Sequence, residues 1–251
     1  MNRKIFVVLA VIILLIITGC TYEKKAQASD AVKLEQEKKE EKSDAVKFKE
    51  EYEKLNGKKV KNGDNVYRSV EISEDNPFIY ADAEKIITMM DNGESFVVYF
   101  GFANCPWCRS VLPTLIEVSN DLKLNKIYYV DISEMRDQLE INDDGEVVTI
   151  KEGSEGYLSL LKRFDNVLDD YTLVNEDEEE IKTGEKRIYA PSVISIVNGK
   201  AKELETGVSD EQDDPYMELT DQMKKETYNK FKCSIDCVLK SKNSCSSKNA
   251  C

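Results

Sequence analysis

The sequence predicts an α/β fold, and three consecutive segments carry this prediction. Residues Phe96 to Phe100 (FVVYF) form an unbroken apolar run, which is typical of a strand that is buried on both faces. Arg109 to Leu122 places its apolar residues mostly on one side of a helix, and Lys126 to Ile132 (KIYYVDI) is a second strand candidate. A strand, a helix and a strand in this order predict a parallel βαβ unit.

Two further features define the region around this unit. Asp82 can cap a helix that runs to about Asn92, and Gly93 can end it. Pro113 falls inside the helix that follows the FVVYF strand. Because proline removes a hydrogen-bond donor and clashes with the preceding turn, we expect a kink there.

The stretch from residue 133 to 187 is less regular. Asp143-Asp144-Gly145 lies between apolar runs and predicts a turn. Apolar residues at three- and four-residue spacing between Leu158 and Leu168 predict a helix. The acidic segment from Glu176 to Glu180 is expected to be a solvated loop rather than a metal site.

Regular structure is expected again near the end of the chain. Ser192 to Val197 (SVISIV) and Lys200 to Glu205 predict two strands joined by a hairpin turn at Asn198-Gly199. A helix from about Pro215 to Val238 should close the domain.

Charge and composition exclude several classes of function. The 251 residues contain 35 Lys and Arg against 48 Asp and Glu, and the formal net charge of -13 argues against binding to nucleic acid. Histidine is absent, which excludes Ser-His-Asp triads, Cys-His proteases, HExxH zinc sites and His-ligated haem. Any chemistry must therefore use Cys, carboxylate, Lys, Tyr or Ser side chains.

The amino terminus predicts export from the cytoplasm. Arg3 and Lys4 precede an apolar run from Ile5 to Ile17, which is shorter than the roughly 20 residues that a membrane span needs. Residues 1–19 are therefore predicted to be a signal peptide. Ile17-Thr18-Gly19-Cys20 resembles the bacterial lipobox, which implies cleavage before Cys20 and lipidation of this cysteine. An uncleaved anchor is the alternative, and both place the rest of the chain on the outer face of the bacterial cell membrane.

Residues 20–55 are predicted to be a lipidated cysteine and a charged tether. Tyr22 to Leu55 is rich in Lys, Glu, Ala and Ser and has few apolar residues to offset the entropy of ordering. The sequence SDAVK occurs at residues 29–33 and again at 43–47, a spacing that also permits a solvated, partner-binding helix. We favour a spacer that holds a folded domain, residues 56–232, clear of the lipid.

Residues 233–251 form a cysteine-rich tail that contains Cys233, Cys237, Cys245 and Cys251. Outside the cytoplasm an even number of cysteines favours structural disulfides, here two bonds with three possible pairings. A relay that exchanges disulfides with the cysteines at 105 and 108, a four-cysteine metal site, and unpaired or intermolecular thiols are the alternatives.

The strongest chemical signal is Cys105-Pro106-Trp107-Cys108, between the FVVYF strand and the helix that follows. At a helix N-terminus, free N–H groups and the helix dipole stabilise an anion. We expect Cys105 to be the exposed attacking thiolate, with a lowered pKa. Cys108, one turn further along, should be more buried and should act as the resolving thiol. A CxxC motif can also bind a metal or form a structural bridge, but its place in the predicted fold favours redox chemistry.

With these features the sequence resembles the thioredoxin family from about Pro77 to Lys232. Pro113 falls where the family kinks its active-site helix, Ala190-Pro191 is similar to the cis-proline loop that faces the CxxC, and Asn198-Gly199 and Gly207 fit the family's hairpin turn and strand end. The resemblance implies a central mixed sheet flanked by helices, with an insertion of about residues 133–188 before the cis-proline strand. The phrase FVVYFGFANCPWCRSVLPTL is similar to bacteriocin-transport accessory proteins of Gram-positive bacteria.

Two residues depart from the family pattern. Tyr99 stands where the family often has a buried acid that accepts the proton of the resolving thiol. Asn104 replaces the tryptophan that thioredoxins have before the motif. Both departures put efficient reduction of thioredoxin-type substrates in doubt.

The resemblance implies a membrane-anchored thiol–disulfide oxidoreductase that acts on protein clients and exchanges electrons with a redox partner protein. It implies no cofactor and no metal. The catalytic residues would be Cys105 and Cys108, and Pro106, Trp107, Ala190 and Pro191 would contact the client. The alternative is a redox-inert accessory lipoprotein that uses the same fold to bind a partner. The direction of electron flow is left open by the sequence.

Overall fold

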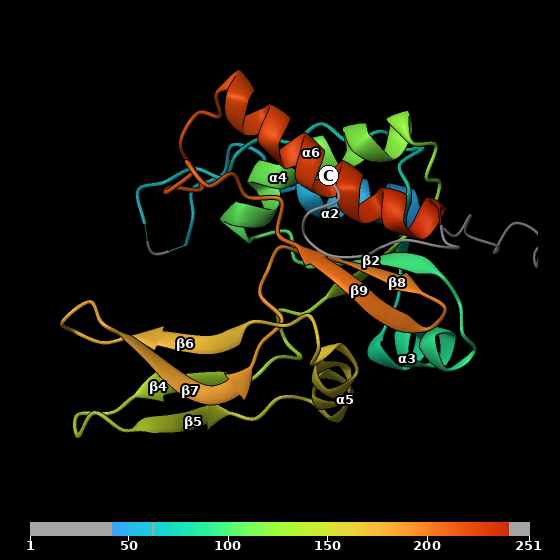
Figure 1. Cartoon of the computed structure of the whole chain (residues 1–251). Helices are drawn as coiled ribbons and strands as arrows, with labels where there is room; N and C mark the ends of the chain where they lie inside the picture. The colour runs from blue at the N-terminus through green and yellow to red at the C-terminus, as the bar shows by residue number, and fades with distance from the viewer. Residues whose placement is uncertain (1–41, 62, 241–251) are drawn as a thin grey trace, which may run out of the picture. The chain divides into compact units, whose positions relative to one another are not determined.

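The computed structural model describes residues 42–61 and 63–240 (Figure 1). The predicted signal peptide, Cys20, Cys245 and Cys251 lie outside the described residues. No helix among the described residues is both long enough and apolar enough to cross a membrane.

A five-stranded mixed sheet lies at the centre of the fold, with the strand order β1-β3-β2-β8-β9. Its strands are β1 (Phe78–Tyr80), β2 (Phe96–Gly101), β3 (Ile127–Asp131), β8 (Ser192–Val197) and β9 (Lys200–Glu205). The first three are parallel, and β8 pairs antiparallel with both β2 and β9. The predicted α/β class, the βαβ unit and the hairpin at Asn198-Gly199 are confirmed. Strand β1 was not predicted, because three residues are too few for a periodic signal.

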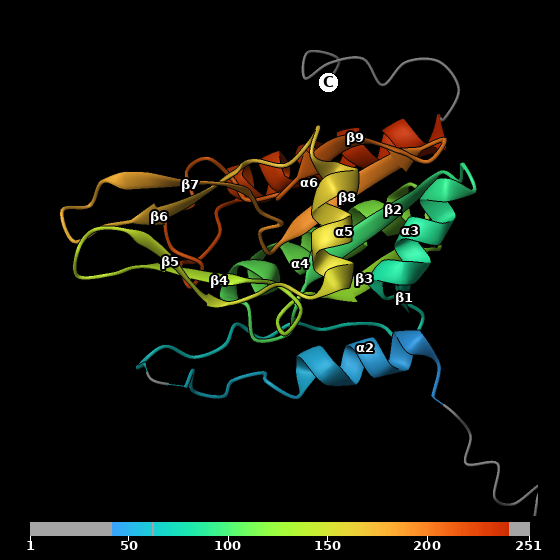
Figure 2. The same ribbon diagram turned by 90° about the horizontal axis from the view of Figure 1, so that it is seen from below.

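Helices cover both faces of this sheet (Figures 1 and 2). One face is covered by α2 (Asp44–Glu53), α4 (Pro106–Asp121) and α6 (Asp221–Leu239), and the other by α3 (Ala83–Asp91) and α5 (Glu155–Phe164). Strand β2 is buried along its whole length, as its unbroken apolar run predicts.

Helix α2 corrects the predicted boundary between tether and domain. Its residues were expected to belong to a spacer that extends to residue 55, but Phe48 and Tyr52 are fully buried in the main core. Phe48 stacks on Phe78 of β1 with ring centroids 4.0 Å apart. The mean composition of the segment concealed this, because two aromatic residues four positions apart are enough to form one buried stripe on a short helix. The compact domain therefore begins at Asp44.

Local capping explains where the other helices begin. Asp82 accepts a hydrogen bond from the Lys85 N–H at 2.8 Å and caps α3, as predicted. Thr220 caps α6 in the same way, so this helix begins later than the expected Pro215. Helix α4 continues through Pro113.

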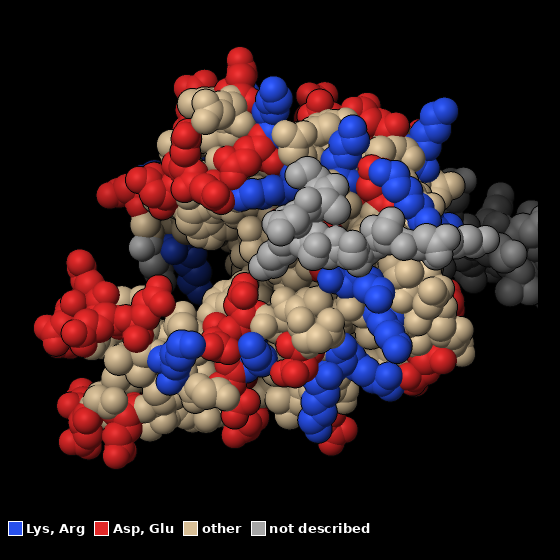
Figure 3. Space-filling model, viewed as in Figure 1, with Lys and Arg blue, Asp and Glu red and all other residues tan. Residues whose placement is uncertain are grey.

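The segment between β3 and β8 contains two hairpins and α5. The hairpins are β4 (Gln138–Ile141) with β5 (Val147–Lys151) and β6 (Asp170–Val174) with β7 (Glu180–Lys186). The first contains the predicted turn, with Gly145 at φ 79°. The second was not predicted, because the segment that precedes β7 is strongly acidic. Figure 3 shows acidic side chains gathered at the ends of both hairpins.

Candidate redox site

Cys105 lies at the N-terminus of α4, directly after the loop that leaves β2. It is the N-cap residue of this helix and has an extended backbone, with φ −78° and ψ 117°. Its Sγ accepts a hydrogen bond from the Cys108 N–H at 3.1 Å, and its own N–H donates to the Phe102 carbonyl at 3.1 Å. The cysteine sulfur therefore satisfies a helix N–H group that has no partner within the helix.

These contacts lower the pKa of Cys105. The largest contribution is a hydrogen bond from the side chain of Cys108, and burial opposes it. The backbone N–H groups of Cys108 and Trp107 and the positive charge of Arg136 lower the pKa further. Cys105 is thus the cysteine at which a thiolate is stabilised, as its sequence position predicts.

Arg136 was not identified from the sequence. It follows β3, and its guanidinium lies 4.9 Å from the ring centroid of Phe102, in the loop before Cys105. Because β2 and β3 are parallel, the residues after both strands meet at one edge of the sheet. The predicted parallel βαβ unit could have placed the loop after β3 near Cys105. No sequence pattern, however, distinguishes Arg136 from other charged residues in that loop.

The expectation that Cys105 is exposed is wrong. Its exposed fraction is 4%, and that of Cys108 is 0%. The Ala190-Pro191 loop explains this burial: its peptide bond is cis, and the Cys105 thiol donates to the Ala190 carbonyl at 3.4 Å. The structure thus brings Ala190 to Cys105 across a sequence separation of 85 residues. Pro191 is buried, whereas Pro106 and Trp107 are partly exposed.

Cys108 has the opposite electrostatics. Burial and the adjacent Cys105 raise its pKa well above the ordinary value of a thiol. The Phe102 backbone and a hydrogen bond with Tyr99 act in the other direction. The two cysteines therefore differ strongly in acidity, and Cys105 ionises first.

Two buried tyrosines, Tyr99 and Tyr52, lie near Cys108. Tyr99 of β2 and Tyr52 of α2 are both fully buried, and their hydroxyl oxygens are 3.2 Å apart. Burial raises the pKa of each well above that of an exposed tyrosine, so both hydroxyls stay protonated. The sequence pointed to Tyr99, but the contribution of Tyr52 was missed because it belongs to the assumed tether.

Arg109, the residue after Cys108, is also fully buried. Its Nε donates to the Arg68 carbonyl at 2.7 Å, and its Nη1 donates to the carbonyls of Tyr52 at 2.9 Å and Ala103 at 3.0 Å. Its Nη2 donates to Asn56 Oδ1 at 2.5 Å. One guanidinium therefore joins α4 to α2, to the Ala103 loop and to the segment that contains Asn56 and Arg68.

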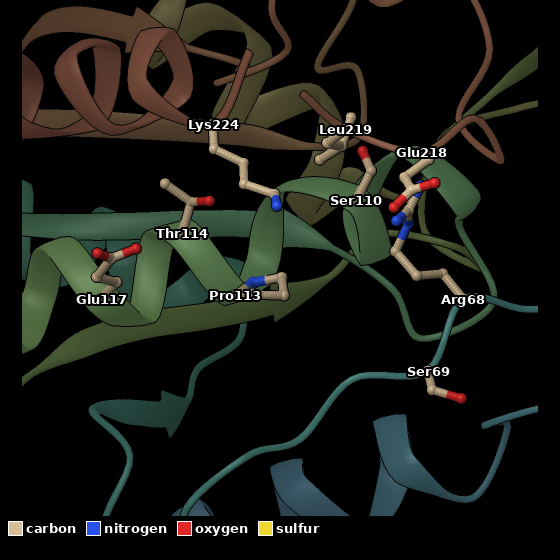
Figure 4. A pocket seen from close by; sticks show the side chains of 9 residues that line it. All are labelled: Arg68, Ser69, Ser110, Pro113, Thr114, Glu117, Glu218, Leu219 and Lys224. Atoms are coloured by element: carbon tan, nitrogen blue, oxygen red, sulfur yellow. The ribbon is translucent and has the colours of Figure 1, made fainter. Parts of the chain in front are cut away.

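A pocket of about 350 Å³ lies further along α4, between this helix and the start of α6 (Figure 4). It is lined by Arg68, Ser69, Ser110, Pro113, Thr114, Glu117, Glu218, Leu219 and Lys224, most of which are polar or charged residues. The lining contains neither cysteine of the motif, so the pocket does not coincide with the redox site.

Helix α6 continues to Leu239 and packs Ile235 and Val238 into the main core, so the predicted boundary between the domain and the tail at residues 232 and 233 is wrong. Two cysteines of the predicted tail therefore lie on α6. Cys233 and Cys237 are both disulfide-bonded. Cys245 and Cys251 lie outside the described residues, so the pairing stays a prediction. Among the described residues, Cys105 and Cys108 are the free cysteines.

Comparisons with known proteins give no family assignment. No family model matches the chain, and no curated protein sequence matches it either.

Proposed function

We propose that this protein is a thiol–disulfide oxidoreductase with a thioredoxin-like fold that acts through Cys105 and Cys108. One observation carries the proposal: the Sγ of Cys105 caps α4, accepts the Cys108 N–H and lies against the Ala190 carbonyl. This arrangement provides a stabilised thiolate, a second thiol one turn away and a backbone segment beside the reacting sulfur.

The reaction is an exchange of disulfide bonds. The Cys105 thiolate attacks one sulfur of a client disulfide and forms a mixed disulfide, and Cys108 then resolves it and closes the Cys105–Cys108 bond. The reverse sequence oxidises a client dithiol. Clients would be extended protein segments that contact Pro106, Trp107, Ala190 and Pro191, and a redox partner protein would restore the starting state.

The predicted signal peptide and lipidation site indicate where the protein would act. A chain that is lipidated at Cys20 and exported would hold this domain on the outer face of the bacterial cell membrane. Disulfide chemistry is favourable in such a compartment, and the disulfide bonds at Cys233 and Cys237 agree with an oxidising environment.

Tryptophan fluorescence tests the proposal directly. Trp107 is the single tryptophan of the chain and lies between the two cysteines. Because a disulfide quenches a neighbouring indole, its emission should change on reduction with one two-electron midpoint. A midpoint above about −200 mV would favour oxidation of clients, and one below about −250 mV would favour their reduction.

The control is Cys108→Ser, which cannot form the bond and should give no redox-dependent emission. If a signal persists in that variant, the electron-carrying pair lies elsewhere in the chain. A redox-inert accessory protein would instead keep its cellular function when Cys105 is replaced by Ser.

A further inference from the structure

The thiol of Cys108, which would resolve the mixed disulfide in the proposed reaction, lies beside the buried hydroxyl of Tyr99. Cys108 is fully buried, and the Tyr99 hydroxyl beside it counteracts the rise of its pKa. The Tyr99 hydroxyl oxygen lies 3.2 Å from that of Tyr52. The three groups form a continuous chain of polar atoms inside an apolar core whose rings include Phe78 and Tyr129. Buried polar atoms in such a core are costly unless they bond one another.

One direction of the hydrogen bonds in this row of polar groups would stabilise a thiolate at Cys108. Each phenol has a single O–H hydrogen and can also accept a hydrogen bond. When Tyr52 donates to the Tyr99 oxygen, the hydrogen of Tyr99 is free to point to Cys108 Sγ. A neutral phenol does not act as the base that a carboxylate would be, but it can donate to a developing negative charge.

We propose that Tyr99 is a catalytic residue that donates a hydrogen bond to the Cys108 thiolate, and that Tyr52 is the residue that positions it. The inference rests on the proposed function, because it concerns the resolving half of the same reaction. Donors that are aimed at a charge developing in a low-dielectric site contribute more than they would in water.

Cys108 attacks the Cys105 sulfur of the mixed disulfide, the bond between Cys105 and the client sulfur breaks, and the Cys105–Cys108 bond forms. The proton of Cys108 leaves with the departing client sulfur, which becomes a thiol. The client is reduced by two electrons and the dithiol is oxidised by two, and Tyr99 keeps its own proton throughout.

The position of Tyr52 connects the amino-terminal helix to this step. Its carbonyl accepts a hydrogen bond from Arg109 at 2.9 Å, so α2 is bonded directly to the redox helix. Phe48, one turn earlier, fixes α2 on the sheet through its stacking on Phe78. The hydroxyl of Tyr52 is therefore held in place from both sides.

The experiment separates the two halves of the reaction with the aromatic disulfide DTNB as the probe. The reduced full-length protein is mixed with less than one equivalent of DTNB in a stopped-flow instrument. Attack by Cys105 releases one coloured thiolate, and resolution by Cys108 releases a second in a phase that does not depend on concentration. The Cys105→Ser variant records any contribution from other thiols.

We expect Tyr99→Phe to keep the first phase and to slow the second about tenfold, because a hydrogen bond to a charged group is lost. The pH profile of the second phase should also shift to higher pH, which a purely structural role would not cause. Tyr52→Phe should slow the second phase less, about threefold. The double variant should be no slower than Tyr99→Phe alone.

Tyr129→Phe is the matched control. It removes another hydroxyl from the same core, where Tyr129 donates to Glu51 Oε1 at 2.9 Å, and it should leave both phases unchanged. A second phase in Tyr99→Phe that is as fast as in the unmodified protein would overturn the inference, and so would a slower phase with an unshifted pH profile. Absence of the first phase in the unmodified protein would instead refute the proposed function.

Discussion

The face of the central sheet under α2, α4 and α6 buries tyrosine hydroxyls, a guanidinium and paired serines, whereas the face under α3 and α5 buries mostly aliphatic and phenyl side chains. On the first face, Ser195 of β8 donates to the Ser234 carbonyl at 2.6 Å. On the second, Leu160 and Phe164 of α5 and Ile86 of α3 are fully buried and apolar. Cys108 belongs to α4 on the polar face, and Cys105 is the N-cap residue of the same helix.

The two faces are stabilised in different ways. An apolar face is stabilised by burial and shape, so it tolerates changes that preserve volume. A polar face is stable only while its donors and acceptors remain matched, and each broken bond has a large effect. The proposed redox chemistry would need buried groups that respond to charge, and such groups lie on one side of the sheet.

The largest effect is expected from Arg109→Met. This change removes the donor from three carbonyl groups and from Asn56 Oδ1, and it leaves the Tyr52 and Ala103 carbonyls buried and the other two acceptors partly buried. We expect a loss of about 4 kcal/mol of unfolding free energy, measured by urea denaturation. If the variant were as stable as the unmodified protein, the polar face would not depend on its matched donors and acceptors.

Leu160→Ala, on the opposite face, is the reference for that measurement. It should cost about 3 kcal/mol through the cavity it creates. The rate at which Cys105 is alkylated should stay unchanged, because Leu160 belongs to the apolar cluster of the other face. In Arg109→Met, by contrast, this rate should change together with stability.

The second prediction concerns α2. Phe48→Ala should cost about 3 kcal/mol, because it removes a fully buried ring that stacks on β1. Lys54→Ala, at an exposed position just after the same helix, should cost less than about 0.5 kcal/mol. Equal and small effects in thermal unfolding would mean that α2 does not belong to the folded domain.

The third prediction tests whether the charge of Arg136 lowers the pKa of Cys105. Arg136→Gln removes a positive charge that lowers the pKa of Cys105, so this pKa should rise and less thiolate should be present near pH 6. Alkylation of Cys105 by neutral iodoacetamide at that pH should slow about threefold. Lys151→Gln removes the same charge at an exposed position and should have no effect on this rate. Equal slowing in both variants would mean that Arg136 acts only through the net charge of the protein.

The smallest effect belongs to Glu226 at the edge of the polar face. Its carboxylate accepts from Lys230, the Ser209 hydroxyl and the Asp210 N–H, which lower its pKa to about 2. A lowered pKa contributes stability above about pH 4.5 that is lost as the pH falls toward 2. Because the group is partly exposed, we expect less than about 1 kcal/mol. Glu226→Gln should remove this pH dependence, and an unchanged dependence would assign it to other acids.

Sequence patterns predicted the elements whose signals are local. The FVVYF strand, the helix capped by Asp82 and the Asn198-Gly199 hairpin each follow from a run, a cap or a turn pair, and the structure confirms them. The place of Ala190-Pro191 beside Cys105 came from family resemblance alone, and the structure puts the Ala190 carbonyl next to the sulfur.

The missed features depend on contacts between distant segments. Tyr52 and Tyr99 are 47 residues apart, and Arg109 bonds to segments 41 to 57 residues earlier. A charged, low-hydropathy segment gives no periodic signal when only two of its residues are buried. The exposure of Cys105 was misjudged for the same reason, because the covering loop comes from a distant part of the chain.

The docking of α2 gives the domain a defined point at which mechanical load enters. A pull on the chain before residue 44 acts first on Asp44, whose carboxylate accepts the Tyr80 N–H at 3.1 Å, and then on the Phe48 stack. Helix α2 would peel from the sheet while the β2–β3 and β2–β8 pairings stay intact, since the load reaches those strands later. Peeling would carry Tyr52 away from Tyr99. With the proposed lipid anchor and the proposed role of Tyr99, a pull on the anchor would therefore slow the reaction of Cys108 before the domain unfolds.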